Sequence, residues 1–164
     1  MSDAATTPPT GPLSHIDASG AAHMVDVTEK TATKRVAIAA GSLRTTAEVV
    51  ELISAGGLAK GDALATARIA GIQAAKRTSE LIPLCHQLAL TGVAIDFAAN
   101  ASDVEITAAV HSTDRTGVEM EALTAVSVAA LTLYDMIKAV DPAARIDDIR
   151  VLRKAGGRRG TWTR

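Results

Sequence analysis

A long apolar helix pattern near the C-terminal end of the chain constrains the fold most strongly. It runs from Val118 to Val140, begins after the turn residue Gly117 and ends at Asp141-Pro142, because a proline disfavours helical backbone at the preceding residue. Its body is rich in Ala, Val and Leu, so it requires burial against other elements. Charged residues cluster near both of its ends, and such charges are candidates for chemistry.

Apolar periodicity also predicts strands and two further helices. Alternating residues predict strands at 34–40, 93–97, 104–110 and 149–151, with a turn signal from Asn100 to Asp103 between the middle two. Helices are predicted at 47–55, after the capping box that starts at Thr45, and at 63–76, capped by Asp62. Residues 24–27 fit a loop or an edge strand, and residues 78–87 are irregular around Pro83.

The resulting order of elements is β-α-α-β-β-α-β. With the first two helices counted as one crossover, this is the split βαβ arrangement of ferredoxin-like folds. We therefore predict an α+β fold in which helices pack on one face of an antiparallel sheet. The other face is either solvated or buried against another subunit. Small apolar residues there, Ala94, Ala98 and Ala109, favour a homo-oligomer.

Composition narrows the function classes. The 164-residue length fits one domain, and with 48% apolar but only 2% aromatic residues the core must be Ala, Val, Leu and Ile. A net charge of −1 gives no global basic field for nucleic acid. The single cysteine, Cys85, excludes an internal disulfide and fits the cytoplasm. No uninterrupted apolar run reaches the ~20 residues of a membrane span, so no membrane partner is expected.

Three regions are predicted along the chain. Residues 1–22 are expected to form a disordered leader, because their proline-rich start has neither the cationic end nor the apolar run of a secretory signal. Residues 23–155 are expected to form a single α+β domain, the one that carries the candidate catalytic residues. Residues 156–164, with glycines and arginines, are expected to form a flexible basic tail that either closes over phosphates or stays disordered.

The charges on the long helix allow two interpretations each. Asp135 and Lys138 share a helix face, so they form either a surface ion pair or a lysine tuned by a carboxylate for proton transfer. Glu119 and Glu121 lie in the first turn, where the helix dipole favours carboxylates. They either cap the helix or accept hydrogen bonds from the edge of a purine-like base.

Other candidate residues lie outside this helix. His86 follows Cys85, but adjacent side chains seldom face each other, so contact between His86 and a ligand is the better hypothesis than a catalytic dyad. Lys60 precedes a helix N-terminus, which favours an anion. The histidines show no zinc spacing and there is no second cysteine, so no metal site is predicted. Phosphate-binding glycine loops of the standard nucleotide folds are also absent.

Several segments together resemble one family. They are Lys60-Gly61-Asp62, the run from Ala67 to Lys76, Ile82-Pro83-Leu84-Cys85-His86, and Thr116 to Lys138 with its Thr-Gly-Val-Glu-Met-Glu-Ala-Leu-Thr-Ala sequence. On these residues the chain resembles the cyclic pyranopterin monophosphate synthases, the molybdenum cofactor biosynthesis protein C family. The resemblance extends from about Leu13 to Gly160, and it, rather than composition, implies a function.

The resemblance implies a lyase of molybdenum cofactor biosynthesis. Its substrate would be (8S)-3',8-cyclo-7,8-dihydroguanosine 5'-triphosphate, and its products cyclic pyranopterin monophosphate and diphosphate. It also implies a ferredoxin-like domain in a hexamer, a trimer of dimers with active sites between subunits. No cofactor is required, although Mg²⁺ could accompany the phosphates. The implied catalytic residues are Lys60, Asp135 and Lys138. The implied substrate-binding residues are Arg35, Leu84, Cys85, His86, Glu119, Met120, Glu121 and Lys154.

Three departures from the family pattern bear on these roles. Gln87 replaces the proline that usually follows the histidine, and Arg158 and Arg159 change the tail. The alternative function is a non-catalytic, nucleotide-binding regulatory module of ferredoxin-like fold, or an inactive paralogue. An RNA-binding module is disfavoured, because base stacking needs exposed aromatic residues and Phe97 lies on the predicted core face.

Overall fold

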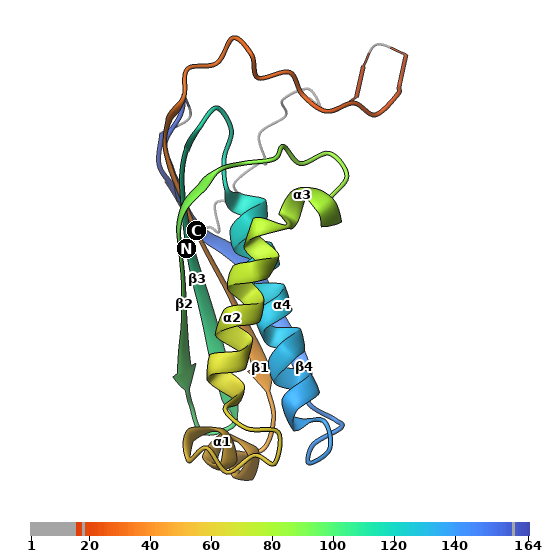
Figure 1. Cartoon of the computed structure of the whole chain (residues 1–164), viewed down its shortest axis with the longest axis vertical. Coiled ribbons are helices and arrows are strands. Elements are labelled where there is room, and N and C mark those ends of the chain that lie inside the picture. Colours follow the sequence, from red (N-terminus) through yellow and green to blue (C-terminus); the bar gives the residue numbers. More distant parts are fainter. Residues whose placement is uncertain (1–15, 18, 159) are drawn as a thin grey trace, which may run out of the picture.

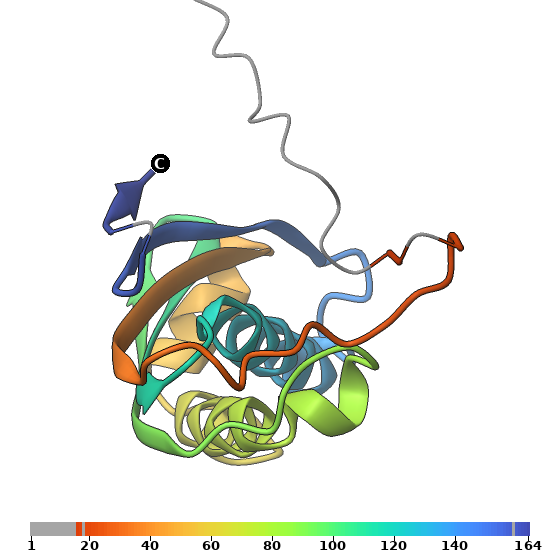
Figure 2. The ribbon, with the colours of Figure 1, turned by 90° about the horizontal axis from the view of Figure 1, so that it is seen from above.

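The protein folds into one antiparallel sheet that carries its helices on one face (Figures 1 and 2). The computed structural model describes residues 16–17, 19–158 and 160–164. Its elements, in chain order, are β1 (Thr33–Arg44), α1 (Ala47–Ser54), α2 (Ala63–Lys76), α3 (Thr78–Leu81), β2 (Leu90–Ala99), β3 (Asp103–Asp114), α4 (Glu119–Ile137), β4 (Arg145–Ala155) and β5 (Trp162–Thr163). The order of strands across the sheet is β2-β3-β1-β4-β5, and the first four have the ferredoxin-like arrangement, which confirms the predicted fold class.

The sheet builds its core from alternate residues of the two central strands. Register pairs Ala37 of β1 with Val110 of β3, and Leu43 with Val104, and all four side chains are completely buried under the helices. Residues one position along face the other way. There, on the face without helices, Ala94 of β2 lies opposite Ala109 of β3. The expected open face of small residues is therefore present.

Helix α4 is the central helix of the core. It packs against α2 and against β1, β3 and β4, and Figure 2 shows both helices on the same side of the sheet. By length and composition α4 could cross a membrane, with a mean hydropathy of 1.4, but 56% of that window is buried inside the protein. Its apolar character is thus explained by its place in the core.

A close approach between α2 and α4 explains the glycine inside α2. A β-carbon at Gly71 would overlap the side chain of Ile95 and lie 2.8 Å from the carbonyl oxygen of Ala125 in α4. Glycine weakens a helix by roughly 1 kcal/mol relative to alanine. At this position that cost is offset, because the missing side chain lets the two helices pack closely.

The structure differs from the sequence-based expectations mainly at element ends. The strands are longer than their alternating cores, and α3 forms within the segment 78–87 that we expected to be irregular. Residues 24–27 are a loop. Two residues of the expected tail, Trp162 and Thr163, pair with β4 as β5. Of the expected leader, a bridge between Ile16 and Ala22 is described, whereas residues 1–15 lie outside the described part of the chain.

Candidate active site

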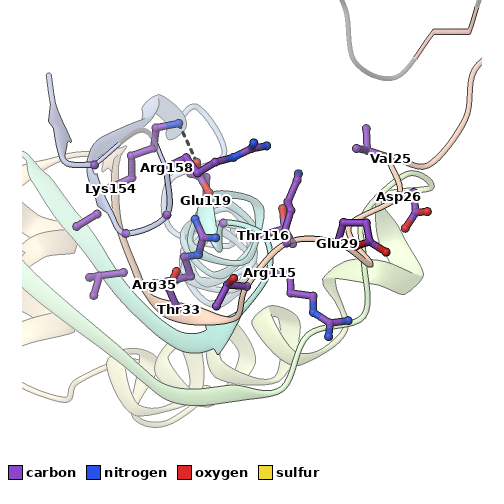
Figure 3. Close-up of a pocket in the computed structure, with 18 residues that line it drawn as sticks. Val25, Asp26, Glu29, Thr33, Arg35, Arg115, Thr116, Glu119, Lys154 and Arg158 are labelled. Carbon is purple, nitrogen blue, oxygen red and sulfur yellow. Dashed lines mark hydrogen bonds and ion pairs between the residues drawn. The ribbon is translucent and has the colours of Figure 1, made fainter.

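A large cavity lies at the N-terminal end of α4, between three segments distant in sequence (Figure 3). Its volume is about 990 Å³, and its wall is built by residues from the segments 25–36, 115–119 and 154–158, with Gly160. Its cationic side chains are Lys30, Arg35, Arg115, Lys154 and Arg158. Its acidic side chains are Asp26, Glu29 and Glu119. We call this space the basic cavity, since its cations outnumber its carboxylates and suit it to a polyanion.

Glu119 and Lys154 form an ion pair in the wall of the basic cavity. The Nζ atom of Lys154 donates to Oε1 of Glu119 over 2.9 Å. The Glu119 carboxylate folds back over Gly117, where a β-carbon would overlap it. The Glu119 side chain therefore does not extend along α4 into solvent. Lys154 of β4 keeps it in the wall of the basic cavity.

A smaller hollow of about 330 Å³ adjoins the basic cavity. Both are lined by Val25, Lys30, Thr116, Gly117 and Glu119. The hollow is also lined by the predicted binding residues Leu84, Cys85, His86, Met120 and Glu121. All eight predicted substrate-binding residues consequently line one or other of two adjoining spaces at this end of the protein.

The His86 ring ties the 82–88 loop to the segment before β1. Its Nε2 atom lies 2.7 Å from the carbonyl oxygen of Val25, which favours the tautomer that donates from Nε2. Among the described residues no hydrogen bond joins His86 to Cys85, and burial, followed by the charge of Glu121, raises the pKa of the Cys85 thiol. The cysteine is thus a poor nucleophile here, because the thiolate is disfavoured.

Glu121 is the most deeply buried acid of the site. Only 4% of its surface is exposed, and burial, with a smaller contribution from the charge of Glu119, raises the pKa of its carboxyl group. Sequence analysis placed Glu121 in the first turn but gave no reason to expect burial. A buried carboxyl group in a hollow can pair with donor groups on a ring edge, because the low dielectric strengthens that hydrogen bond.

The three predicted catalytic residues meet at the other end of α4. Lys60 Nζ lies 3.0 Å from Oδ2 of Asp135, and Lys138 Nζ lies 2.7 Å from its Oδ1. Hydrogen bonds from Lys138 and then Lys60 lower the pKa of Asp135 to about 2. The same pairing raises the pKa of Lys138. We call these residues the lysine–aspartate cluster, and all three are exposed.

The basic cavity and the lysine–aspartate cluster are far apart within one chain. They lie at opposite ends of α4, which has 19 residues and therefore extends about 28 Å. Figure 1 shows α4 running from the loops in the upper part of the view to the bottom, where α1 lies. The structure thus brings the predicted binding residues together at one end of α4 and the predicted catalytic residues together at the other end. Within one chain, the two groups remain far apart.

Comparisons with known protein families and sequences find matches over most of this chain. The MoaC family model matches residues 24–157, which include both groups of residues. The chain belongs to the MoaC family. It is 79% identical over 154 residues to cyclic pyranopterin monophosphate synthase 2 of Mycobacterium tuberculosis, covering 94% of this chain and 92% of that protein. It is 61% identical to the cyclic pyranopterin monophosphate synthase of Streptomyces coelicolor over 93% of this chain and 89% of that protein.

This MoaC-family chain has cavity residues that sequence analysis missed. Lys30 and Arg115 line the basic cavity, although nothing in their local sequence distinguishes them from solvated charges. Thr33 also lines it, and its hydroxyl is buried without a hydrogen-bond partner among the described residues. A buried hydroxyl without a hydrogen-bond partner is costly for folding.

Within residues 16–17, 19–158 and 160–164, no three His, Cys, Asp or Glu side chains converge as ligands. The chemistry available from the described side chains is proton transfer by lysine and carboxylate, and electrostatic stabilisation of phosphate by lysine and arginine.

Proposed function

We propose that this chain is a cyclic pyranopterin monophosphate synthase of molybdenum cofactor biosynthesis. It converts (8S)-3',8-cyclo-7,8-dihydroguanosine 5'-triphosphate to cyclic pyranopterin monophosphate and releases diphosphate. The observation that carries the proposal is the basic cavity, which shares part of its wall with a hollow lined by a buried carboxyl group. This arrangement matches a substrate with a triphosphate at one end and a guanine-derived ring at the other, and relatives up to 79% identical bear the synthase name.

The two spaces divide the substrate between them. Arg35 and Lys154 bind the triphosphate in the basic cavity, because guanidinium and ammonium groups form charge-assisted hydrogen bonds with phosphate oxygens. Glu121, with Glu119, accepts hydrogen bonds from the N–H groups of the ring in the smaller hollow. Leu84, Cys85 and Met120 line the hollow and contact the ring face, and His86 donates to the substrate once its bond to Val25 is exchanged.

The lysine–aspartate cluster transfers protons. Rearrangement of the ring breaks and forms C–N bonds, which requires a group that donates a proton to nitrogen and another that removes one. Pairing with Asp135 keeps Lys138 protonated, the form that a donor needs, and Lys60 is the second proton-transfer group. Closure of the cyclic phosphate follows when a sugar hydroxyl attacks the α-phosphorus and diphosphate leaves with the bonding electron pair. Cations beside the phosphates stabilise that leaving charge.

An oligomer would bring the two halves of the site together. Since about 28 Å of helix separates them in one chain, the lysine–aspartate cluster of one subunit acts on substrate held in the basic cavity of its neighbour. The sheet face without helices, with Ala94 and Ala109 paired across it, is a surface on which copies of the chain can pack. We infer a cytoplasmic homo-hexamer, a trimer of dimers, that needs no redox cofactor and uses Mg²⁺ at most as a companion of the phosphates.

Turnover by the purified protein tests the proposal. The cyclised dihydro-GTP is incubated with wild type, Lys60→Ala, Lys138→Ala and the control Lys76→Ala, an exposed lysine at the end of α2. Diphosphate release and pterin formation are followed together. We expect both products from wild type and Lys76→Ala. The two cluster variants should bind substrate but lose at least about 100-fold in turnover, the scale of acid–base catalysis.

The opposite result has a specific meaning. A wild-type protein that binds the triphosphate but forms neither product would be a binding-only relative, and the synthase function would be wrong. In that case Gln87 and Arg158, which depart from the family pattern, would be the first positions to restore.

A further inference from the structure

The guanidinium group of Arg35 has an unusual environment in the wall of the basic cavity. Its Nε donates to the main-chain carbonyl oxygen of Asp114 over 3.2 Å. Within the part of the chain that the structure describes, no carboxylate lies at ion-pair distance from it. The bond to Asp114 fixes the orientation of the group and leaves its terminal nitrogens for another partner.

The space that the guanidinium occupies exists because residue 157 is glycine. A β-carbon at Gly157 would overlap Nη1 of Arg35 and come within 2.6 Å of its Cζ and 2.9 Å of its Nη2. Arg35 thus lies against the main chain of the segment that follows β4. Any other residue at 157 carries a β-carbon and would push the guanidinium away from this position.

Two other glycines do not meet the guanidinium in this way. A β-carbon at Gly156 would overlap the main-chain oxygen of Lys34 and lie 3.1 Å from Cδ of Arg35, so that glycine permits the close approach of two backbones. Gly56, which follows α1 and lies outside the cavity, has a φ of +66°, nearly the same as the +68° of Gly157, yet a β-carbon there would meet nothing within 4 Å. A side chain at positive φ has the same backbone cost at Gly56 and Gly157, but only at Gly157 would it also meet the Arg35 guanidinium.

We propose that Gly157 is a positioning residue of the anion site. Because Gly157 has no side chain, the Arg35 guanidinium can lie where the terminal nitrogens of Arg35 meet a phosphate group. The inference rests on the proposed function, since it assumes that the basic cavity takes the triphosphate. It predicts that a methyl group at 157 weakens phosphate binding through Arg35, and not through folding or a stiffer segment.

Pyrophosphate binding to the full-length protein tests this at fixed pH and salt. Isothermal titration calorimetry is carried out on wild type, Arg35→Ala, Gly157→Ala, the control Gly56→Ala and the double variant Arg35→Ala/Gly157→Ala. We expect Arg35→Ala to weaken binding about 10- to 100-fold, the size of a lost charge-assisted hydrogen bond. Gly157→Ala should approach that loss, Gly56→Ala should lose no more than about threefold, and Gly157→Ala should add nothing once Arg35 is absent.

The outcomes separate the two proposals. Equal losses in Gly157→Ala and Gly56→Ala, or an equal loss from Gly157→Ala with and without Arg35, would overturn the positioning role. Unchanged binding in Arg35→Ala would overturn both that role and the assignment of Arg35 to phosphate. Arg35-dependent binding in a wild-type protein that forms no pterin would overturn only the synthase function. Thermal unfolding of each variant shows whether Gly157→Ala is folded, and a folded variant with wild-type affinity also contradicts the inference.

Discussion

Lys60 and Asp135 are 75 residues apart in the sequence, yet the ammonium group of Lys60 forms two hydrogen bonds with Asp135. Nζ of Lys60 lies 2.7 Å from the main-chain oxygen of Asp135 and 3.0 Å from its carboxylate. Since Lys138 binds the other carboxylate oxygen, Asp135 holds both lysines at fixed positions. The loop before α2 and the end of α4 are therefore connected through a single side chain.

Replacement of Asp135 by Asn should abolish turnover without unfolding the protein. The amide keeps the size of the side chain but removes the charge that holds Lys60 and Lys138. We expect turnover to fall at least about 100-fold, while the melting temperature changes little because exposed ion pairs contribute little to stability. Steady-state assays and thermal unfolding measure the two effects. Glu51→Gln, at an exposed acid of α1, is the control, and wild-type turnover in Asp135→Asn would contradict the assigned role.

Mixing inactive variants should restore activity if the site is composite. Lys60→Ala damages the lysine–aspartate cluster and Arg35→Ala the basic cavity, so a mixed oligomer contains some sites with both halves intact. We expect partial recovery after the two proteins are dissociated and reassembled together, measured as pterin formation per subunit. A mixture of Lys60→Ala and Lys138→Ala serves as the control, because both changes lie in the same half. Recovery in neither mixture would argue for a site within one chain.

Gly71→Ala should destabilise the protein although alanine is the better helix former. The added methyl group would meet the carbonyl oxygen of Ala125 at 2.8 Å and displace Ile95. Overpacking of this kind costs about 1–3 kcal/mol, more than the roughly 1 kcal/mol that helix propensity returns. Urea unfolding gives the difference, with Gln73→Ala on the exposed side of α2 as a comparison. If Gly71→Ala were more stable than wild type, α2 and α4 could move apart to accommodate the methyl group without loss of stability.

Glu121→Gln should change how stability depends on pH. Burial raises the pKa of Glu121 in the folded protein above its ordinary value of 4.5, so folding favours the protonated form. The wild type therefore loses stability relative to the variant as pH rises through the folded-state pKa, and the two converge below the unfolded value. We expect the variant to be the more stable at pH 8 and equal at pH 4 in urea unfolding. Turnover should nevertheless fall, because the ring loses its acceptor.

Glu51→Gln again provides the comparison for Glu121→Gln. Its parent carboxylate is exposed on α1, so the stability difference from wild type should not vary between the two pH values. A Glu121→Gln variant that is less stable than wild type at pH 8 would mean that the ionised carboxylate is satisfied in the fold, contrary to the inferred cost of its burial.

Much of the fold could be predicted because its signals are local. The alternation around Ile95 and Ile106 requires strands with one buried face, and the apolar pattern ending at Asp141-Pro142 requires a core helix. The ends of the strands could not be predicted as closely, because a strand extends for as long as a neighbouring strand offers hydrogen bonds. Strand β5 was not predicted for the same reason. Trp162 and Thr163 form a strand only through pairing with β4.

The sequence by itself determined the element order, the ferredoxin-like class and the residue types available for chemistry, since these follow from periodicity and from recognisable motifs. Only the tertiary structure decided which of those residues meet. It buried Glu121, joined Lys60 to Asp135, and set Arg35 against Gly157. It also separated the lysine–aspartate cluster from the basic cavity by the length of α4. Contacts between distant segments depend on how helices and strands pack, and local sequence does not encode that geometry.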